Sequence, residues 1–500
     1  MERIITVLPQ GRKITAQAGE TLLNILRRYE LAPDAPCGGA GTCGKCTVLV
    51  DGAAVRSCAY TVVADITVSL IPKEDTTRVL TEGYGAPTSM EPWQAGHMLA
   101  FDIGTTTVVC YLLQAGTGAL LATCSALNPQ QSFGADVISR IQCALDGEQE
   151  KLTALIRQEM TKLLKSACAQ AGIAPAQIGT ISVVGNTCMQ QLFLGISPEN
   201  LARIPFRPVL TEAKVCAAKA FLPECGQAKL LVVPDIAGFV GADTVGCVLS
   251  TEIDRAGDWT LLVDIGTNGE MVLGNRQRVV ACAAAAGPAL EGAKIHFGMR
   301  GANGAIDHVW VENGTLRCSI IGGGKATGIC GSGIIDAVAV LVELGLVNRR
   351  GRLQSAEQAN PLAAHVREVD GERVFDLADG IYLTQGDIRQ VQLAKGAIAA
   401  GIALMASHLD IEIGDIRQVL LAGAFGSFID AQNACRIGLL PPVLLERTRA
   451  VGNAAGSGAR RLACSKSELQ RAQEITRKTE FLELAALPEF QRCFAKNMGF

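Results

Sequence analysis

The sequence has few of the features that mark several common classes of protein. It contains five histidines, and none of them is spaced to form a metal-ligating pair with another. A mononuclear metal site built on histidine is therefore not expected. The formal net charge is only −3, so there is no electrostatic reason to expect nucleic acid or an anionic membrane surface as a partner.

Long uncharged apolar runs are absent as well. The nearest approach is residues 230–249, where Asp235 and Asp243 interrupt an otherwise apolar segment. Since a membrane-spanning helix needs about 20 consecutive apolar residues, no membrane span is expected. Residues 1–13 have neither the apolar region nor the small-residue cleavage pattern of a secretory signal. We therefore expect a cytoplasmic protein.

The chain is instead long, apolar and rich in glycine. Its 500 residues are 49% hydrophobic and 19% charged, and 54 of them are glycine. This composition excludes a disordered protein and predicts two or three globular domains of the α/β type. Most of the 18 cysteines are scattered singly, and we expect these to be buried thiols rather than disulfides.

Four cysteines stand apart, because they have the spacing Cys37-x5-Cys43-x2-Cys46-x11-Cys58. Three of them come from one glycine-rich loop, and the fourth comes from a separate segment. A [2Fe–2S] cluster needs four thiolates and a loop that approaches its sulfides closely, which glycine permits. A structural zinc site is the alternative, but zinc ribbons use two Cys-x2-Cys pairs and this segment has one. The sequence therefore predicts a [2Fe–2S] cluster on these cysteines.

The segments around these cysteines predict a compact α+β domain of the β-grasp type, a ferredoxin domain over residues 1–72. An apolar stripe predicts a helix at 21–29. Alternating or apolar segments predict strands at 3–8, 12–16, 47–50 and 66–71.

The remaining chain divides into three parts. Residues 73–97 carry charge, proline and glycine without periodicity and are expected to be a flexible linker. Residues 98–465 are expected to form a two-lobed α/β domain. Residues 466–500 are expected to be a tail that packs on this domain or extends it. Helices within the large domain are expected at 150–171, 334–346 and 388–408.

An internal repeat predicts a cleft between two similar lobes. An apolar strand that ends in Asp-Ile-Gly-Thr occurs first at Asp102 and again at Asp264. A third strand-and-glycine segment lies at 419–426. An aspartate at a strand end can hold Mg²⁺ through water, and the amides and hydroxyls of the following turn can meet phosphate oxygens. Two copies of this motif in matching contexts are not expected by chance.

These segments supply the candidate residues of a nucleotide site. Asp102, Asp264 and Glu270 are the candidates for chemistry. Glu270 either acts on the water that attacks the γ-phosphate or stands near Mg²⁺ without touching it. The nucleotide-binding candidates are Gly104, Thr105, Thr106, Gly266, Thr267, Asn268, Gly269, Gly331, Ser332, Gly333, Gly423, Ala424, Phe425 and Gly426.

Four of the weaker signals keep two interpretations each. The loop at 328–333 opens a helix, so its amides either face an anion or ribose or simply begin the helix. Residues 423–426 either pack against adenine or serve strand–helix packing. Asp235 and Asp243 are expected to cap the next helix rather than face the cleft. Asn186 either lines the cleft or occupies a turn.

Three resemblances follow from these motifs. Residues 98 to about 460 resemble the superfamily of acetate kinase, sugar kinases, heat-shock chaperone ATPases and actin. Residues 37–58 resemble plant- and adrenodoxin-type ferredoxins. The order of ferredoxin domain, linker and actin-like ATPase resembles the reductive activators of corrinoid proteins. The strings at 37–46, 102–106, 263–270 and 421–426, and the C-terminal stretch 481–500, are all similar to that family.

The resemblance implies an ATP-hydrolysing electron-transfer protein that uses a [2Fe–2S] cluster, ATP and Mg²⁺. It implies reduction of an inactive Co(II) corrinoid protein to Co(I), which reactivates a methyltransferase system of anaerobic metabolism. The implied partners are that corrinoid protein and a low-potential donor of the ferredoxin or flavodoxin type. Larger members carry an extra middle domain that is expected to be missing here, so a homodimer is one candidate and the oligomeric state stays open.

Energetics favour this combination over a plain electron carrier. A one-electron step that runs about 200 mV uphill is unfavourable by a factor of about 2,400, which nucleotide-driven conformational change can offset. Two alternatives remain at this point. One is a small-molecule kinase whose ferredoxin domain senses redox state, and the other is an activator ATPase of another low-potential metalloenzyme, such as a radical dehydratase.

Overall fold

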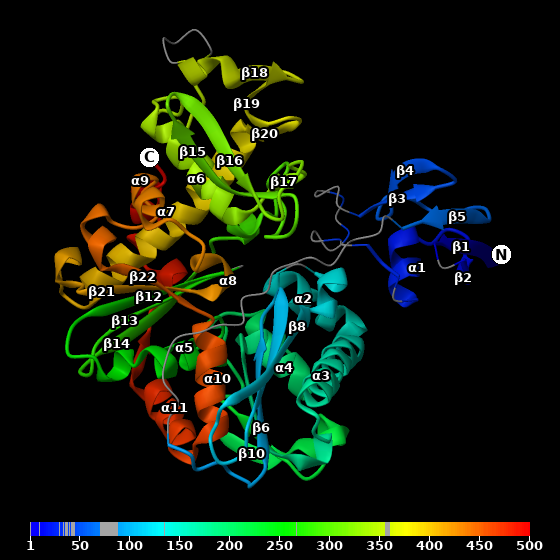
Figure 1. Cartoon of the computed structure of the whole chain (residues 1–500), viewed down its shortest axis with the longest axis vertical. Coiled ribbons are helices and arrows are strands. Elements are labelled where there is room, and N and C mark those ends of the chain that lie inside the picture. Colours follow the sequence, from blue (N-terminus) through cyan, green and yellow to red (C-terminus); the bar gives the residue numbers. More distant parts are fainter. Residues whose placement is uncertain are drawn as a thin grey trace.

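The structure is a computed structural model, and it describes residues 2–9, 11–29, 31–33, 35, 39, 41, 46–70, 89–134, 136–266, 268–355 and 361–500. A small N-terminal domain stands beside a large domain made of two lobes (Figure 1). Each lobe contains a six-stranded sheet. The described helices include none with the length and hydropathy that a membrane crossing requires.

The N-terminal domain is the predicted β-grasp. Its five-stranded sheet has the order β2-β1-β5-β3-β4, with α1 (Leu22–Arg28) packed against it. The alternation seen in the sequence places Ile5 and Val7 in the core, against Leu22 and Leu26 of the helix. The strands are β1 (Glu2–Leu8), β2 (Arg12–Gln17), β3 (Thr47–Val50), β4 (Ala53–Arg56) and β5 (Ile66–Ser69).

The first lobe has the sheet order β10-β11-β9-β6-β7-β8. The central strands are apolar and buried, and α3 (Gln149–Ala171) covers one face of the sheet. This helix confirms the prediction at 150–171. The strands are β6 (His97–Ile103), β7 (Thr107–Leu113), β8 (Leu120–Leu127), β9 (Ile178–Gly185), β10 (Lys214–Ala217) and β11 (Lys229–Val232). Shorter helices complete the lobe: η1 (Pro129–Phe133), α2 (Val137–Cys143) and α4 (Thr187–Leu194).

The second lobe repeats this plan with the order β22-β21-β12-β13-β14-β23. Helix α7 (Gln385–His408) packs against β13 and β14 and confirms the prediction at 388–408. The strands are β12 (Thr260–Ile265), β13 (Gly269–Gly274), β14 (Val279–Ala284), β21 (Gln418–Ala422), β22 (Thr448–Gly452) and β23 (Thr479–Phe481). Two short helices follow β21: α8 (Gly423–Gly426) and α9 (Ala431–Arg436).

Two small sheets extend the second lobe at its outer end (Figure 1). One is ordered β16-β15-β17 and the other β18-β19-β20. Helix α6 (Gly331–Glu343) packs on β15 and overlaps most of the helix predicted at 334–346. The strands are β15 (Ala305–Glu312), β16 (Thr315–Ile320), β17 (Gly328–Ile329), β18 (Val366–Val369), β19 (Glu372–Ala378) and β20 (Ile381–Thr384).

Two helices join the lobes. Helices α5 (Ala242–Thr251) and α10 (Ala454–Cys464) share one hydrophobic core with residues of both large sheets. They cross so closely that a Cβ on Gly458 would lie 2.1 Å from the carbonyl oxygen of Gly246. Glycine is therefore required at this crossing, and α10, from the end of the chain, packs on strands β6 and β9 of the first lobe.

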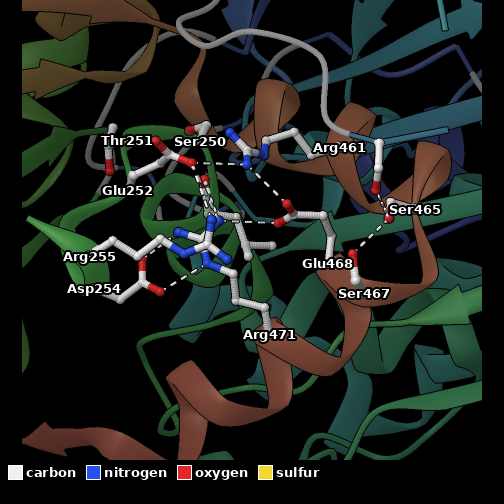
Figure 2. A network of polar contacts seen from close by, with 12 residues as sticks. Ser250, Thr251, Glu252, Asp254, Arg255, Arg461, Ser465, Ser467, Glu468 and Arg471 are labelled. Atoms are coloured by element: carbon white, nitrogen blue, oxygen red, sulfur yellow. Dashed lines mark hydrogen bonds and ion pairs between the residues drawn. The ribbon is translucent and has the colours of Figure 1, made fainter. Parts of the chain in front are cut away.

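A buried ionic network fixes helix α11 (Lys466–Lys478) to the end of α5 (Figure 2). Arg461 Nη2 donates to Glu468 Oε1 at 2.9 Å, and Arg471 Nη1 donates to Glu468 Oε2 at 3.3 Å. Arg471 Nε also donates to Asp254 Oδ2 at 2.9 Å. Both arginines and Glu468 are buried. Such a network holds its elements firmly, because removing one member leaves an uncompensated buried charge.

The C-terminal segment both extends and covers the second lobe. Strand β23 adds to the edge of the sheet next to β14, and α12 (Phe490–Asn497) packs on α7. Gln392 Nε2 donates to the carbonyl oxygen of Met498 at 2.9 Å, and Lys395 donates to that of Gly499. Residues 466–500 therefore both extend the sheet of the second lobe and pack on its helix α7, the two possibilities that the sequence left open.

The linker expected at 73–97 is shorter than predicted at its C-terminal end. Residues 71–88 lie outside the described residues. Residues 89–97 are held on the large domain, since the amide of Glu91 donates to Cys464 O at 2.8 Å and Lys466 N donates to Glu91 O at 2.9 Å. The composition of residues 89–97 did not predict this, because their pairing partner lies far away in the sequence.

The N-terminal domain meets the first lobe through α1. The guanidinium carbon of Arg27 lies 5.7 Å from the ring centroid of Phe133, at the end of η1. The Nζ atom of Lys151 lies 4.8 Å from the same centroid. Arg27 belongs to the N-terminal domain and Lys151 to α3 of the first lobe, so cations of both parts contact the same ring.

Candidate functional site

The cysteine loop can be described in part. Cys37 and Cys43 lie outside the described residues. Cys46 is buried and Cys58 half-buried, and both pack with Leu23 in one small cluster. Gly39 has a φ of +104°, and a Cβ on it would lie 3.2 Å from Leu23 Cδ2 and 4.0 Å from Cys58 Cβ. The close backbone approach and the clustered thiols fit the demands of a [2Fe–2S] site.

The two Asp-Ile-Gly-Thr motifs lie in one cleft. Strands β6 and β12 occupy corresponding positions in their sheets, so Asp102 and Asp264 both reach the space between the lobes. The cleft has a cavity volume of about 270 Å³, which is close to the lower end of the range for small-molecule pockets. It is lined by Asp102, Gly104, Thr105, Thr106, Thr107, Asn186, Asp243, Asp264, Ile265, Gly266, Asn268, Glu270, Leu290, Glu291, Met299, Arg300, Gly301, Asp307, His308, Ile321, Cys330, Gly331, Ser332, Gly423, Phe428, Asn453 and Ala455.

The first glycine–threonine turn is held from behind by buried side chains. Asn128 Nδ2 donates to the carbonyl oxygen of Gly104 at 2.9 Å, and Arg140 Nη2 donates to that of Thr105 at 2.5 Å. Arg140 is completely buried. Because these carbonyls already accept hydrogen bonds from the protein, the turn has a fixed shape before any ligand arrives.

Two asparagines bind this turn from distant parts of the chain. Asn186 Nδ2 donates to Thr105 Oγ1 at 2.9 Å, and Asn453 Nδ2 donates to Asp102 Oδ2 at 2.8 Å. Each asparagine also caps a helix, because its Oδ1 accepts from the amide of Met189 or Gly456. Both interpretations of Asn186 are therefore correct. Sequence reasoning missed Asn453, although the same Val-Gly-Asn follows a strand at 184–186 and at 451–453.

The second motif faces the first across the cleft. Thr106 Oγ1 donates to Glu291 Oε2 at 3.1 Å, which joins the two lobes directly. Gly266 and Asn268 line the cleft, whereas Thr267 lies outside the described residues. Gly269 is not among the lining residues, and a Cβ on it would lie 3.1 Å from Ile398 Cγ1. Gly269 therefore packs closely against α7, and its contact with nucleotide stays a prediction.

The third segment meets the second at one glycine. Gly423 has a φ of +87°, and a Cβ on it would lie 2.4 Å from Asp264 Oδ1. Gly426 is not among the lining residues, and the side chains of Ala424 and Phe425 lie outside the described part of the chain. Phe428, two residues further along, lines the cleft and was not predicted.

The first turn of α6 reaches the cleft with two of its three predicted residues. Gly331 and Ser332 line the cleft, and Ser332 Oγ donates to the carbonyl oxygen of Asp307 at 2.8 Å. Gly333 packs closely on β15, since a Cβ on it would lie 2.4 Å from the carbonyl oxygen of Ile306. Its role in binding stays a prediction.

Four carboxyl groups of the cleft are half-buried and hold protons more tightly than usual. Burial raises the pKa of Asp102 to about 6, although the hydrogen bond from Asn453 opposes this. Burial likewise raises the pKa of Asp264 to about 6 and that of Asp243 to about 7. Burial raises the pKa of Glu270 well above its usual value, and the neighbouring Asp243 and Asp264 add to this. A bound cation would favour the ionised forms.

Asp235 and Asp243 behave differently from each other. Asp235 is buried and accepts from the amide of Ala242 at 3.1 Å, so it caps α5 as expected. Asp243 lines the cleft, which corrects the prediction that it only caps the helix. Among the described residues no three Asp, Glu, His or Cys side chains are close enough together to hold a metal ion by themselves.

Comparison with known proteins gives three matching family profiles. Residues 5–67 match a 2Fe-2S iron-sulfur cluster binding domain. Residues 97–256 match the RACo middle region, and residues 258–500 match the C-terminal domain of RACo, the ASKHA domain. The expected lack of a middle domain is corrected by this finding, because the first lobe itself matches the middle region.

Individual relatives agree with these profiles. The chain is 38% identical over 416 residues to the corrinoid activation enzyme RamQ of Eubacterium limosum, covering 80% of this chain and 70% of the relative. It is 26% identical over 436 residues to a [Co(II) methylated amine-specific corrinoid protein] reductase of Methanosarcina barkeri, covering 80% and 76%. A solved reductive activator for a corrinoid, iron-sulfur protein superposes with a TM-score of 0.72 at 27% identity, covering 100% and 98%.

Proposed function

Because this chain belongs to the family of the reductive activators of corrinoid proteins, we propose that it reduces a Co(II) corrinoid protein to Co(I) at the expense of ATP. The observation that carries the proposal is the combination in one chain of a cysteine-loop ferredoxin domain and a nucleotide cleft built from two Asp-Ile-Gly-Thr motifs. A carrier that only passed electrons downhill would not need the second part.

Cys37, Cys43, Cys46 and Cys58 would hold a [2Fe–2S] cluster, which supplies one-electron transfer when bound. The ferredoxin domain would leave the first lobe, which breaks the contact of Arg27 with Phe133, and would approach a partner. Residues 89–97 would stay fixed on the large domain. The protein's contribution is to deliver the cysteine loop to the corrinoid.

In the cleft, Asp102 and Asp264 would bind Mg²⁺ through water, and the turns at 104–106 and 266–268 would bind the phosphates of ATP. Glu270, opposite Asp264 on the neighbouring strand, would orient the water that attacks the γ-phosphate. Gly423 would face the adenosine, and the amides of Gly331 and Ser332 would face an anion or the ribose. These roles rest on placement at one cleft and on the chemistry of each group.

ATP binding would act through the contacts that join the lobes. Thr106 contacts Glu291 across the cleft, and Arg300 Nη2 donates to Gln131 Oε1 at 2.5 Å. Gln131 belongs to η1, the helix that ends at Phe133 under the ferredoxin domain. Nucleotide-dependent movement of the lobes would therefore reach both the partner surface and the ferredoxin domain.

The proposal also covers the domain boundaries, the location and the partners of the protein. We assign residues 1–72 to the ferredoxin domain and residues 98–465 to the ATPase domain, in a cytoplasmic protein. The electron donor would be a low-potential ferredoxin or flavodoxin, and the corrinoid protein would belong to a methyltransferase system. A homodimer is the assembly we would test first.

The decisive experiment follows the visible spectrum of a Co(II) corrinoid protein mixed with the reduced protein in the absence of oxygen. The Co(I) band is expected with Mg²⁺–ATP and is expected to be absent, or very weak, without ATP. Equal Co(I) yields with and without ATP at a fixed reductant would contradict the coupling. A phosphorylated small molecule formed in proportion to ATP consumed would instead support a kinase.

A further inference from the structure

The cleft that would hold ATP is strongly acidic. Six carboxyl side chains line it: Asp102, Asp243, Asp264, Glu270, Glu291 and Asp307. Among the described lining residues only Arg300 and His308 can carry positive charge. A bound triphosphate adds further negative charge, and one Mg²⁺ ion balances only part of that charge. Arg300 and His308 are then the side chains that can offset the remainder.

Arg300 is already engaged by the protein. Its Nη2 donates to Gln131 Oε1 of the first lobe, and Gln131 Nε2 donates in turn to the carbonyl oxygen of Thr106. These contacts link Arg300 of the second lobe to the turn at Thr106 of the first lobe. Arg300 thus uses part of its set of five N–H donors between the lobes, and His308 is the cationic side chain of the cleft that a buried carboxylate orients.

Asp336 fixes the ring of His308. The Nδ1 atom of His308 lies 2.9 Å from Asp336 Oδ2, and the histidine side chain is 44% exposed while that of Asp336 is 4% exposed. Because Nδ1 is occupied, Nε2 is the ring nitrogen that a molecule in the cleft can meet. The imidazole of His308 is thus half-exposed and held in place by a buried carboxylate, which suits it to contact a ligand.

A second layer holds Asp336 in place. Asn433 Nδ2 donates to Asp336 Oδ1 at 2.7 Å, and Arg436 Nη1 donates to Asn433 Oδ1 at 2.8 Å. Arg436 is also paired with Glu343, at 3.2 Å from Nη1 to Oε2. Three elements, β15, α6 and α9, therefore cooperate to orient one histidine, although no sequence spacing links them.

We propose that His308, as an imidazolium held by Asp336, donates from Nε2 to the polyphosphate of the bound nucleotide. The proposal deepens the proposed function and rests on nucleotide binding in this cleft. It assigns His308 as a nucleotide-binding residue and Asp336 as its positioning residue.

The charged groups that face His308 agree with a protonated ring. The hydrogen bond with Asp336 is the largest cause of the raised pKa of His308, and Asp307 of the same strand and Asp430 before α9 add to it. Partial burial opposes this shift. Arg436, the cation behind Asn433, is directed toward Glu343. A ring with a raised pKa keeps its proton to a higher pH than an ordinary histidine does, and it loses the proton as the pH rises through that pKa.

The test measures affinity of the full-length protein for a non-hydrolysable ATP analogue with Mg²⁺, by calorimetry at a series of pH values. His308→Gln is expected to bind about ten- to a hundredfold more weakly than the wild type at low pH. The difference between the two proteins is expected to shrink as the pH rises through the pKa of His308. This difference isolates the histidine, because protonation of the nucleotide itself affects both proteins equally.

Two variants sharpen the test. His408→Gln removes another histidine–carboxylate pair, with Nε2 at 2.9 Å from Glu480 Oε2 on the surface of the second lobe, and is expected to bind like the wild type. Asp336→Asn is expected to move the pH at which affinity is lost to a lower value. If that variant does not fold, as judged by circular dichroism, the His308→Gln profile alone decides.

The outcomes separate the inference from the proposed function. Adenosine, which has no phosphate, is expected to bind the wild type and His308→Gln equally. A loss of affinity that is the same at every pH, or that is equally large for adenosine, would overturn the proposal in favour of a neutral contact with the nucleoside. A wild-type protein that fails to bind the ATP analogue at any pH would overturn the proposed function itself.

Discussion

Asn453 Nδ2 donates a hydrogen bond of 2.8 Å to Asp102 Oδ2, between residues that are 351 positions apart in the chain. The contact exists because α10 packs on the first sheet and places its capping residue at the end of β6. A donor at this position favours the ionised carboxylate, which is the form that a hydrated magnesium ion needs.

Replacing Asn453 with alanine is expected to weaken Mg²⁺–ATP binding most at mildly acidic pH. Burial already raises the pKa of Asp102 to about 6, and loss of the donor raises it further. Binding that needs ionised Asp102 is then lost at a higher pH than in the wild type. Affinity measured against pH checks this, with Asn497→Ala in α12 as the control. A uniform loss at all pH values would assign Asn453 a purely structural role.

Gly423→Ala is expected to impair nucleotide binding and to destabilise the second lobe by about 1–3 kcal/mol. The added Cβ would lie 2.4 Å from Asp264 Oδ1, and the φ of +87° disfavours any side chain. Gly414→Ala is the matched control, because a Cβ there meets nothing within 4 Å. Thermal unfolding and ATP affinity of both variants are the measurements, and equal behaviour would show that the approach to Asp264 is not critical.

Cys58→Ser is expected to abolish or strongly alter the visible absorption of the [2Fe–2S] cluster, because serine replaces a thiolate ligand. Cys216→Ser is the control, since Cys216 is a partly exposed thiol of β10 in the first lobe. Iron and sulfide content and the visible spectrum, measured after anoxic purification, provide the readout. A full cluster content in Cys58→Ser would exclude this residue as a ligand. ATP affinity of the variant is expected to remain unchanged, because the cleft lies in the other domain.

Arg471→Met is expected to destabilise the large domain by about 3–5 kcal/mol, since Glu468 and Asp254 then lose a buried cation (Figure 2). Arg477 lies on the exposed side of the same helix. Arg477→Ala is therefore expected to change the free energy of unfolding by less than about 0.5 kcal/mol. Thermal unfolding followed by circular dichroism compares the two. Similar midpoints for both variants would show that the network adds little to stability.

Much of the fold and part of the site could be predicted because their signals are local. Alternating and helical apolar patterns located four of the five β-grasp strands and the helices α1, α3 and α7, since each pattern lies within one element. The aspartates at 102 and 264 were recognisable because a strand end and its turn are contiguous in sequence. The close packing of Gly269 and Gly333 was not predicted, because a glycine required for packing and one required for a ligand look the same in a sequence.

The sequence by itself therefore determined the division into a ferredoxin domain and a two-lobed nucleotide-binding domain, together with the motifs of each. The tertiary structure alone decided that Asn453 meets Asp102, that Asp243 and His308 enter the cleft, and that residues 89–97 belong to the large domain. The physical reason is that these relationships depend on helices and strands from distant segments packing together. Such packing is set by the shape and burial of whole elements, which the spacing of a few residues does not record.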